Sequence, residues 1–261
     1  MTKIAKYLLS MHYVTIEALV IVALFNSFSQ GNPPINVSIA VITTAVLDII
    51  LKKVLLNQKP SLPLSAIITG LIIGLVTPFQ TNTLAVIIPS ILAVLSKFFI
   101  RLKGTHIFNP AVFGVVTAIL VFSSIASHAP SGATDHMSAQ ASIGGFAVNL
   151  ILVPLLVYAS YTARKLWLAV PNLIISGLLY VLTGLTTINS VVITLPYFFS
   201  FIIASEPKTT PSSKKQQLIF GVVIAIFPFL PFLIGGSYNH IGALLSLLIG
   251  NLVYGIYRTR S

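Results

Sequence analysis

Apolar runs of roughly 15 to 20 residues recur along the whole of this sequence, and this is near the length that a helix needs to cross about 30 Å of hydrocarbon. Hydrophobic residues make up 56% of the chain and charged residues only 7%, whereas a soluble domain carries about a quarter charged residues. A soluble fold is therefore excluded. The short alternating segments of a transmembrane β-barrel are also missing from the sequence.

The apolar runs predict an all-α polytopic membrane protein with about ten transmembrane helices, whose ends are placed to within a few residues. The predicted spans are 12–28, 37–56, 64–78, 84–100, 111–126, 143–160, 168–185, 188–204, 218–235 and 239–257.

The basic residues alternate with these spans. All 15 Lys and Arg residues fall before the first span or around the ends of the even-numbered spans, which puts them on one side of the membrane. By the positive-inside rule that side is cytoplasmic, so both termini are predicted to be cytoplasmic. The net charge of +11 is therefore explained by short loops, and it gives no reason to expect a nucleic-acid partner.

Two segments of equal length suggest an internal duplication. Ser61-Leu62-Pro63 opens a segment that closes on Thr77-Pro78, and Thr194-Leu195-Pro196 opens one that closes on Thr210-Pro211. Their offset is five spans, and because five is odd the copies cross in opposite directions, which predicts an inverted 5+5 repeat. The predicted organisation is a first repeat over 1–127, an external loop over 128–142 and a second repeat over 143–261.

Both matched segments look like interrupted helices. Broken helices expose backbone N–H and C=O groups, which a bilayer tolerates only where these groups line a cavity or meet a ligand. In the second segment Glu206 is a candidate to bind a cation or a polar ligand, or else to pair with Lys208 at the surface. Glu17 lies inside the first span, where it is a candidate for an ion pathway or a side chain that reaches the interface. Asp48 is expected to pair with Lys52, one helical turn away.

The longest external loop contains His128, Asp135 and His136. These side chains offer nitrogen and oxygen ligands to a metal ion, but their spacing matches no standard site, so no metal is predicted. The chain has no cysteine, which excludes disulfides and cysteine-ligated iron–sulfur clusters within it. Any redox chemistry therefore needs a bound cofactor.

Three motifs together resemble the RnfD/NqrB family, the membrane subunits of redox-driven ion pumps. The first is Gly104 to Gly114, which resembles the family's phenylalanine-asparagine-proline-alanine signature before its fifth span. The second is Ser131-Gly132-Ala133-Thr134 in the external loop. The third is Ser205 to Pro211, followed by Gln217 to Gly221. With the ten-span plan, the resemblance covers most of the chain.

The resemblance implies a flavin-carrying subunit of the prokaryotic inner membrane. In the family, flavin mononucleotide is attached by a phosphoester to the second hydroxyl residue of such a loop motif, which is Thr134 here, with Ser131, Gly132 and Ala133 around it. The chain departs from the usual pattern at Ala129 and His136. A second, noncovalently bound flavin is left open.

The predicted central site, where electron and ion movement are coupled, takes Asn109 and Pro110 from the first half. From the second half it takes Glu206, Pro207, Thr209 and Thr210. The expected partners are the other subunits of an Rnf- or Nqr-type complex, a flavin transferase, and Na⁺ or H⁺. No catalytic residue is assigned, because the complex is the enzyme.

Two alternatives use the same scaffold. Inverted repeats with paired broken helices also build small-solute channels and transporters, and this reading predicts no flavin. A purely structural assembly subunit is the other alternative, which predicts that Thr134→Ala leaves function intact.

Overall fold

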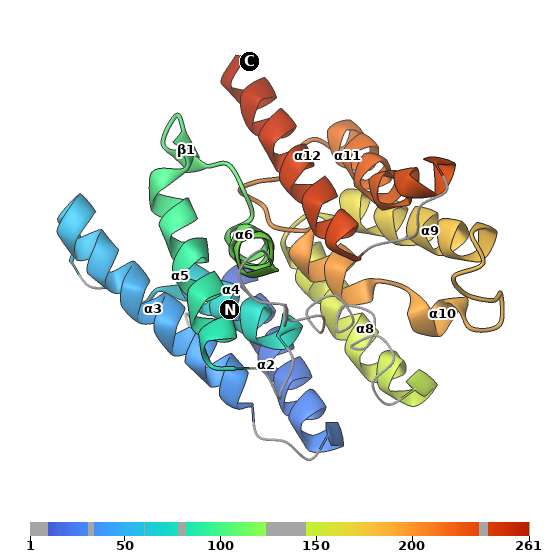
Figure 1. Cartoon of the computed structure of the whole chain (residues 1–261), viewed down its shortest axis with the longest axis horizontal. Helices are drawn as coiled ribbons and strands as arrows, with labels where there is room; N and C mark the ends of the chain where they lie inside the picture. Colours follow the sequence, from blue (N-terminus) through green and yellow to red (C-terminus); the bar gives the residue numbers. More distant parts are fainter. Residues whose placement is uncertain are drawn as a thin grey trace, which may run out of the picture. The chain divides into compact units, whose positions relative to one another are not determined.

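A computed structural model gives the architecture of the chain (Figure 1). It describes residues 10–30, 34–59, 61–77, 82–123, 145–234 and 240–260. Most of these residues lie in helices, which agrees with an all-α membrane protein, while the number of spans stays a prediction. Several of the apolar helices are shorter than 18 residues. Three helices in the described ranges are long and apolar enough to cross a membrane, over Met11–Phe28, Lys214–Phe232 and Ile241–Thr259.

The chain divides into two compact units, unit 1 over Met1–Ala133 and unit 2 over Thr134–Ser261. The elements of unit 1 are α2 (Met11–Gln30), α3 (Ile35–Leu56), α4 (Leu64–Val76), α5 (Leu84–Phe99), β1 (Arg101–Leu102), β2 (Thr105–His106) and α6 (Pro110–Ser123).

In unit 1, α3 packs along α4, and two glycines on α4 let the backbones approach closely. A Cβ atom added at Gly70 would lie 2.6 Å from the Cα of Val41, and one at Gly74 would lie 2.4 Å from the Cα of Val37. Small residues four apart are a common way to pack membrane helices, because they allow backbone contact where a hydrophobic driving force is missing. The close α3–α4 contact thus depends on both glycines.

A two-residue turn joins β1 to β2 between α5 and α6. Lys103 and Gly104 have φ angles of 45° and 79°, and two successive left-handed residues form the tight hairpin turn that suits paired strands. The hairpin brings the chain back to α5, since Ile107 N–H donates to the Ile100 carbonyl oxygen at 3.2 Å. This return places Asn109 and Pro110 at the start of α6.

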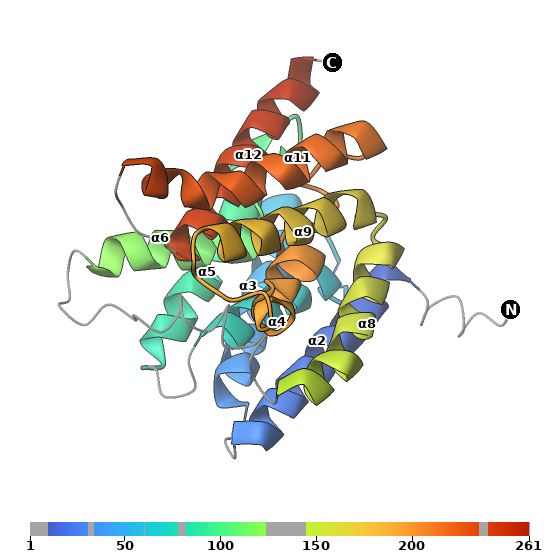
Figure 2. The same cartoon turned by 90° about the vertical axis from the view of Figure 1, so that its right-hand side faces the viewer.

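The elements of unit 2 are α8 (Gly145–Thr162), α9 (Leu166–Leu182), α10 (Val191–Thr194), η1 (Phe199–Ile203), α11 (Lys214–Ile226), η2 (Phe227–Ile234) and α12 (His240–Arg260). Helices α9 and α11 lie side by side (Figures 1 and 2). A Cβ atom at Gly221 would lie 2.3 Å from the carbonyl oxygen of Leu168, so this contact also depends on a glycine.

The two units pack their helices in the same order along the chain. In unit 1, α4 contacts α2 and α3, α3 contacts α5, and α5 contacts α6. In unit 2, η1 contacts α8 and α9, α9 contacts α11, and α11 and η2 contact α12. Both the predicted duplication and the inverted relation between the halves stay predictions.

The predicted span 188–204 is not one continuous helix. Helix α10 ends at Thr194, and the backbone of the next residue, Leu195, is extended (φ −57°, ψ 140°), because a proline disfavours the helical conformation of the residue before it. After Pro196 the chain forms η1, which is a π-helix. The interruption therefore lies inside the predicted span 188–204, ahead of the turn around Glu206. The matched segment in unit 1, α4, is an uninterrupted helix of 13 residues.

Candidate functional site

The turn after η1 brings four of the predicted site residues together. Glu206 Oε2 accepts a hydrogen bond from Thr209 Oγ1 at 2.8 Å, and the Glu206 carbonyl accepts one from Thr210 Oγ1. Both threonines are buried, while Glu206 and Pro207 are half-buried. Short-range hydrogen bonds of this kind offer the backbone an alternative to a helix. The turn is therefore held in an irregular conformation by its own side chains.

Lys165 contacts this turn from the start of α9, and the sequence analysis did not select it. Its side chain is 3% exposed. Its Nζ donates hydrogen bonds to the carbonyl oxygens of Thr210 at 3.0 Å and Pro211 at 2.6 Å. The neighbouring Arg164 is exposed, so only one of two adjacent basic residues turns inward.

The conformation at the end of α8 explains this difference. Arg164 adopts a left-handed conformation with φ 58°. Its N–H donates to the carbonyl of Tyr161, and the Lys165 N–H donates to the carbonyl of Ser160. This pair of bonds is a Schellman motif, which ends a helix and reverses the direction of the chain. The reversal directs Lys165 toward the turn.

Burial lowers the pKa of the Lys165 ammonium from its ordinary value of 10.5 to about 8, and the negative charge of Glu206 opposes this shift. Removal from water penalises the charged form, whereas a nearby opposite charge favours it. With a pKa of about 8, the side chain still carries its charge at pH 7. The turn therefore holds a buried ammonium group against carbonyl oxygens.

Two buried amides on α11 and α12 also bind this region. Asn251 Nδ2 donates to the carbonyl oxygen of Thr209 at 3.0 Å. Gln217 Nε2 donates to the carbonyl oxygens of Arg164 at 3.0 Å and Ser212 at 3.1 Å. Gln217 Oε1 is buried and has no hydrogen-bond partner among the described residues. An unpaired buried acceptor costs free energy of folding, so Gln217 is held in place by the two bonds of its amide nitrogen and not by its oxygen.

A chain of buried polar side chains lies behind the turn. Ser205 Oγ lies 3.1 Å from Ser160 Oγ and donates to the carbonyl of Ser200 at 2.9 Å. Ser200 Oγ donates to Asn172 Oδ1 at 2.7 Å, and Asn172 Nδ2 donates to the carbonyl of Gly221 at 3.2 Å. These bonds connect α8, η1, α9 and α11. A π-helix often marks a functional position, and here it lies within a hydrogen-bonded network.

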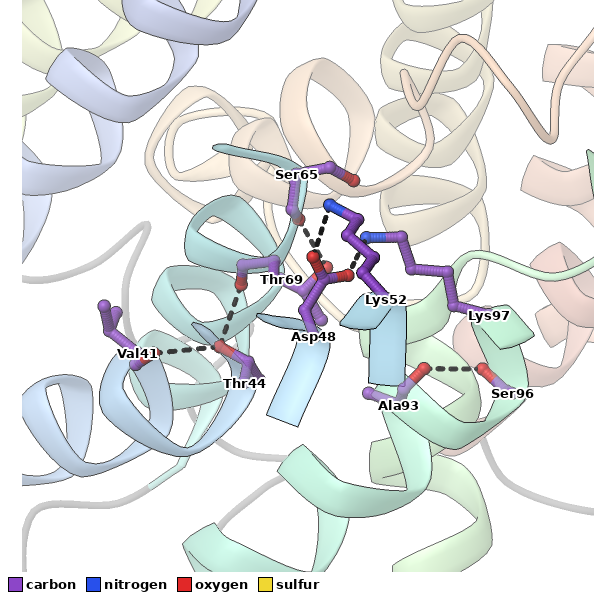
Figure 3. A network of polar contacts seen from close by, with 10 residues as sticks. Val41, Thr44, Asp48, Lys52, Ser65, Thr69, Ala93, Ser96 and Lys97 are labelled. Atoms are coloured by element: carbon purple, nitrogen blue, oxygen red, sulfur yellow. Dashed lines mark hydrogen bonds and ion pairs between the residues drawn. The ribbon is translucent and has the colours of Figure 1, made fainter. Parts of the chain in front are cut away.

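Unit 1 contains a buried ion cluster, shown in Figure 3. The side chain of Asp48 is fully buried, and its carboxylate lies 2.5 Å from Lys52 Nζ and 2.9 Å from Lys97 Nζ. The predicted pair with Lys52 is confirmed, and Lys97 from α5 is a second partner. Nearby, Thr44 Oγ1 on α3 donates to the Ala66 carbonyl of α4 at 2.9 Å. Polar contacts therefore join α3 to both α4 and α5.

Asn109 and Pro110 start helix α6. Asn109 Oδ1 accepts a hydrogen bond from the N–H of Val112 at 3.2 Å, which is the usual bond of an asparagine at a helix N-cap. Pro110 is the first residue of the helix, where proline is favoured because its missing N–H has no helical partner anyway. Both residues are buried. They belong to unit 1 and the turn around Glu206 belongs to unit 2, so a central site shared by the two sets stays a prediction.

The remaining predicted residues are placed as follows. Glu17 is exposed on α2. Thr134, Ser131, Gly132 and Ala133 lie outside the described residues. The same is true of the other polar residues of that loop, His128, Asp135 and His136. Within the described ranges, no group of three or more His, Asp or Glu side chains is arranged to hold a metal ion.

The comparisons with known proteins give no family assignment. No protein-family model matches the chain, and no curated protein matches it.

Proposed function

We propose that this chain is a flavin-carrying membrane subunit of an Rnf- or Nqr-type complex, which couples electron transfer to the movement of Na⁺ or H⁺. The observation that carries the proposal is the interrupted segment around η1. There Lys165 and Glu206 place charge beside buried carbonyl groups that no helix uses, in an otherwise apolar chain. Interrupted helices with exposed carbonyls are how many membrane carriers bind ions.

The flavin part of the proposal rests on the sequence motif alone. Thr134 is the proposed attachment point of flavin mononucleotide, with Ser131, Gly132 and Ala133 beside it. When bound, the flavin ring supplies electron transfer, and the protein holds and orients the ring. The Gly-Ala pair gives a flavin transferase access to the threonine hydroxyl. The proposed partners are that transferase and the other subunits of the complex.

The proposed location is the cytoplasmic membrane of a prokaryote, with both termini on the cytoplasmic side and the loop 128–142 outside. The distribution of basic residues supports this orientation. The chain has no cysteine, so each single-cysteine variant carries one unique label site. A cysteine at position 134 is expected to react with an impermeant maleimide added to intact spheroplasts, and one at position 59 only after the membrane is opened. The reverse pattern would contradict the topology.

Covalent flavin is tested by ultraviolet fluorescence of the denatured protein in a gel, after expression with its native flavin transferase. The wild type is expected to fluoresce, and Thr134→Ala is expected to be dark. Ser138→Ala is the matched control, because it removes a hydroxyl from the same loop outside the motif and leaves the proposed acceptor. A dark wild-type band under conditions that label a known flavinylated protein would overturn the flavin assignment.

A flavin-free cation transporter is the second candidate, and the buried ion cluster of unit 1 favours it. Ionisable groups within apolar helices are costly and often mark ion pathways, and Asp48 and Lys97 are the groups proposed for this role. This candidate predicts cation flux in proteoliposomes that contain only this chain. Flux without flavin would favour it over the redox subunit.

A further inference from the structure

Helices α9 and α11 lie side by side and run in the same direction (Figure 2). Gln217 Nε2 donates to the carbonyl oxygen of Arg164 at 3.0 Å. About one helical turn further along both segments, a Cβ atom at Gly221 would lie 2.3 Å from the carbonyl oxygen of Leu168. Contacts that advance together along both helices indicate parallel packing. Both helices therefore begin at the same surface, which is cytoplasmic in the predicted topology.

Each of these two helices has a row of exposed apolar side chains that starts near this end. The row on α9 is spaced by three or four residues, so it follows one face of the helix. It consists of Trp167, Val170, Ile174, Leu178 and Leu182, and the exposed apolar residues of α11 are Leu218, Ile219, Val223 and Ile226. A helix of 17 residues is roughly 25 Å long, which is most of the thickness of a bilayer core. The rows are therefore long enough to contact lipid acyl chains through a whole leaflet.

Basic side chains lie where the two rows begin. Lys214 Nζ lies over the ring of Trp167, 5.4 Å from its centroid, and this contact joins the start of one row to the start of the other. Lys215 follows on α11, and Arg164 lies just before α9. All three basic side chains are exposed, and none of them forms an ion pair with a described residue. Three positive charges thus border an exposed apolar surface.

We propose that this corner, defined by Arg164, Trp167, Lys214 and Lys215, binds an anionic phospholipid. The lipid phosphate contacts the basic side chains, and the acyl chains lie along the exposed rows of α9 and α11. Basic residues at the cytoplasmic surface of a membrane attract anionic lipids, and tryptophan favours the level of the headgroups. The inference goes beyond the redox function and requires neither flavin nor ion movement.

A lipid fits this surface better than an acidic protein does. Both would neutralise the positive charges, but a soluble acidic partner would contact only the ends of the helices. The apolar rows that start beside these charges would then have no part in binding. A phospholipid has a negative charge and apolar chains in one molecule, so it accounts for both features.

Trp167 is the only tryptophan of the chain, so its fluorescence reports on this corner directly. The full-length protein is reconstituted into vesicles of phosphatidylcholine and phosphatidylglycerol, with bromine in the acyl chains of one lipid at a time, near the headgroup. Bromine quenches tryptophan on contact. The wild type is expected to prefer phosphatidylglycerol by at least about fivefold at low salt, and added salt is expected to reduce this preference by screening the charges.

The double variant Lys214→Gln, Lys215→Gln is expected to lose most of the preference. Positive charge is unfavourable at the start of a helix, so this change is not expected to weaken α11. Lys53→Gln is the matched control, because Lys53 is exposed at the end of α3 and belongs to the same predicted side of the membrane. It is expected to keep the preference of the wild type. Each variant is compared with its own emission in lipid without bromine, since Lys214 contacts the ring of Trp167.

Four results would overturn the proposal. Equal quenching of the wild type by the two brominated lipids would show contact with the bilayer without headgroup selection. No quenching by either lipid would show that protein, such as a second copy of the chain, covers this face. An unchanged preference in the double variant would remove the role of the lysines. Free glycerol phosphate that competes as well as whole phosphatidylglycerol would show an anion site without a role for acyl chains.

These outcomes are separate from those of the flavin experiment. The protein for the quenching measurement is expressed without a flavin transferase, so a flavin at Thr134 does not affect the result. A dark protein that selects phosphatidylglycerol would remove the flavin and keep the lipid site, and a fluorescent protein without lipid selection would do the reverse.

Discussion

The carboxylate of Asp48 on α3 lies 2.9 Å from the ammonium of Lys97 on α5, although 48 residues separate the two in the chain. Asp48 is fully buried, whereas the side chains of Lys52 and Lys97 are 25% and 12% exposed. The aspartate is thus the centre of the cluster, because its single negative charge pairs with two lysines that still reach the surface.

Asp48→Asn is expected to destabilise the protein by about 3 kcal/mol, since removal of one partner leaves the other charges of a buried pair uncompensated. Lys97→Met is expected to cost less, because Asp48 keeps Lys52. Thermal unfolding in detergent measures both. Lys53→Ala, at an exposed neighbouring lysine, controls for the loss of a positive charge. An Asp48→Asn protein as stable as Lys53→Ala would contradict the role of the cluster.

Gly70→Ala is expected to destabilise unit 1 by about 1–3 kcal/mol, because the added methyl group meets the backbone of α3, which has little freedom to move. Gly242→Ala is the control. Its Cβ would lie 3.4 Å from the Cα of Pro228, and alanine favours a helix more than glycine does. Urea unfolding of the two variants in detergent should separate them. Equal loss in both would mean that α3 and α4 do not approach as closely as described.

Ser200→Ala is expected to cost about 1–3 kcal/mol, because Asn172 Oδ1 then stays buried without the hydroxyl that donates to it. The double variant Ser200→Ala with Asn172→Leu removes the donor and the acceptor together. The double variant is expected to lose less stability than the two single variants lose in sum. A double-mutant cycle measures this difference as a coupling energy. Strict additivity would show that the two side chains do not interact.

The stability of unit 2 is expected to rise with pH between about 8 and 10.5. In this window the unfolded chain still binds a proton on Lys165, which has a pKa of about 8 in the folded state instead of 10.5. Stability rises with pH wherever the unfolded state binds more protons. The gain over the whole window is about 3 kcal/mol. Thermal melts of the wild type and Lys165→Met in choline buffer across this range isolate the effect, which the variant should lack.

Local sequence patterns predicted much of the helix layout, and contacts between distant residues account for most of what they missed. The apolar runs locate the helices because a helix that is buried or crosses a membrane needs a long stretch of apolar residues. The i,i+4 spacing predicts the pair of Asp48 and Lys52. The partner Lys97 belongs to another helix, so no local pattern reveals it. The break at Pro196 falls inside the predicted span 188–204, although the proline is a local signal for it.

In the candidate site, too, the sequence predicts the residues that a local pattern marks and misses those that depend on contacts between distant residues. Glu206, Thr209 and Thr210 stand out because they are polar residues at a proline-bounded break in an apolar chain. Lys165 does not stand out, because Arg164 beside it is equally basic and only the left-handed turn at Arg164 decides which of them is buried. Gln217 stands in the sequence only as part of a motif. Its burial depends on the contact of α11 with the turn at Arg164 and with the turn at Ser212.

The serine and asparagine bonds around η1 have a mechanical consequence. Because Ser205, Ser200 and Asn172 join η1 to α8, α9 and α11, the π-helical segment cannot slide alone without breaking bonds to three neighbours. Packed interfaces of this kind tend to switch between discrete arrangements and do not deform gradually. Any opening around the interruption is therefore expected to rotate these helices together as one block.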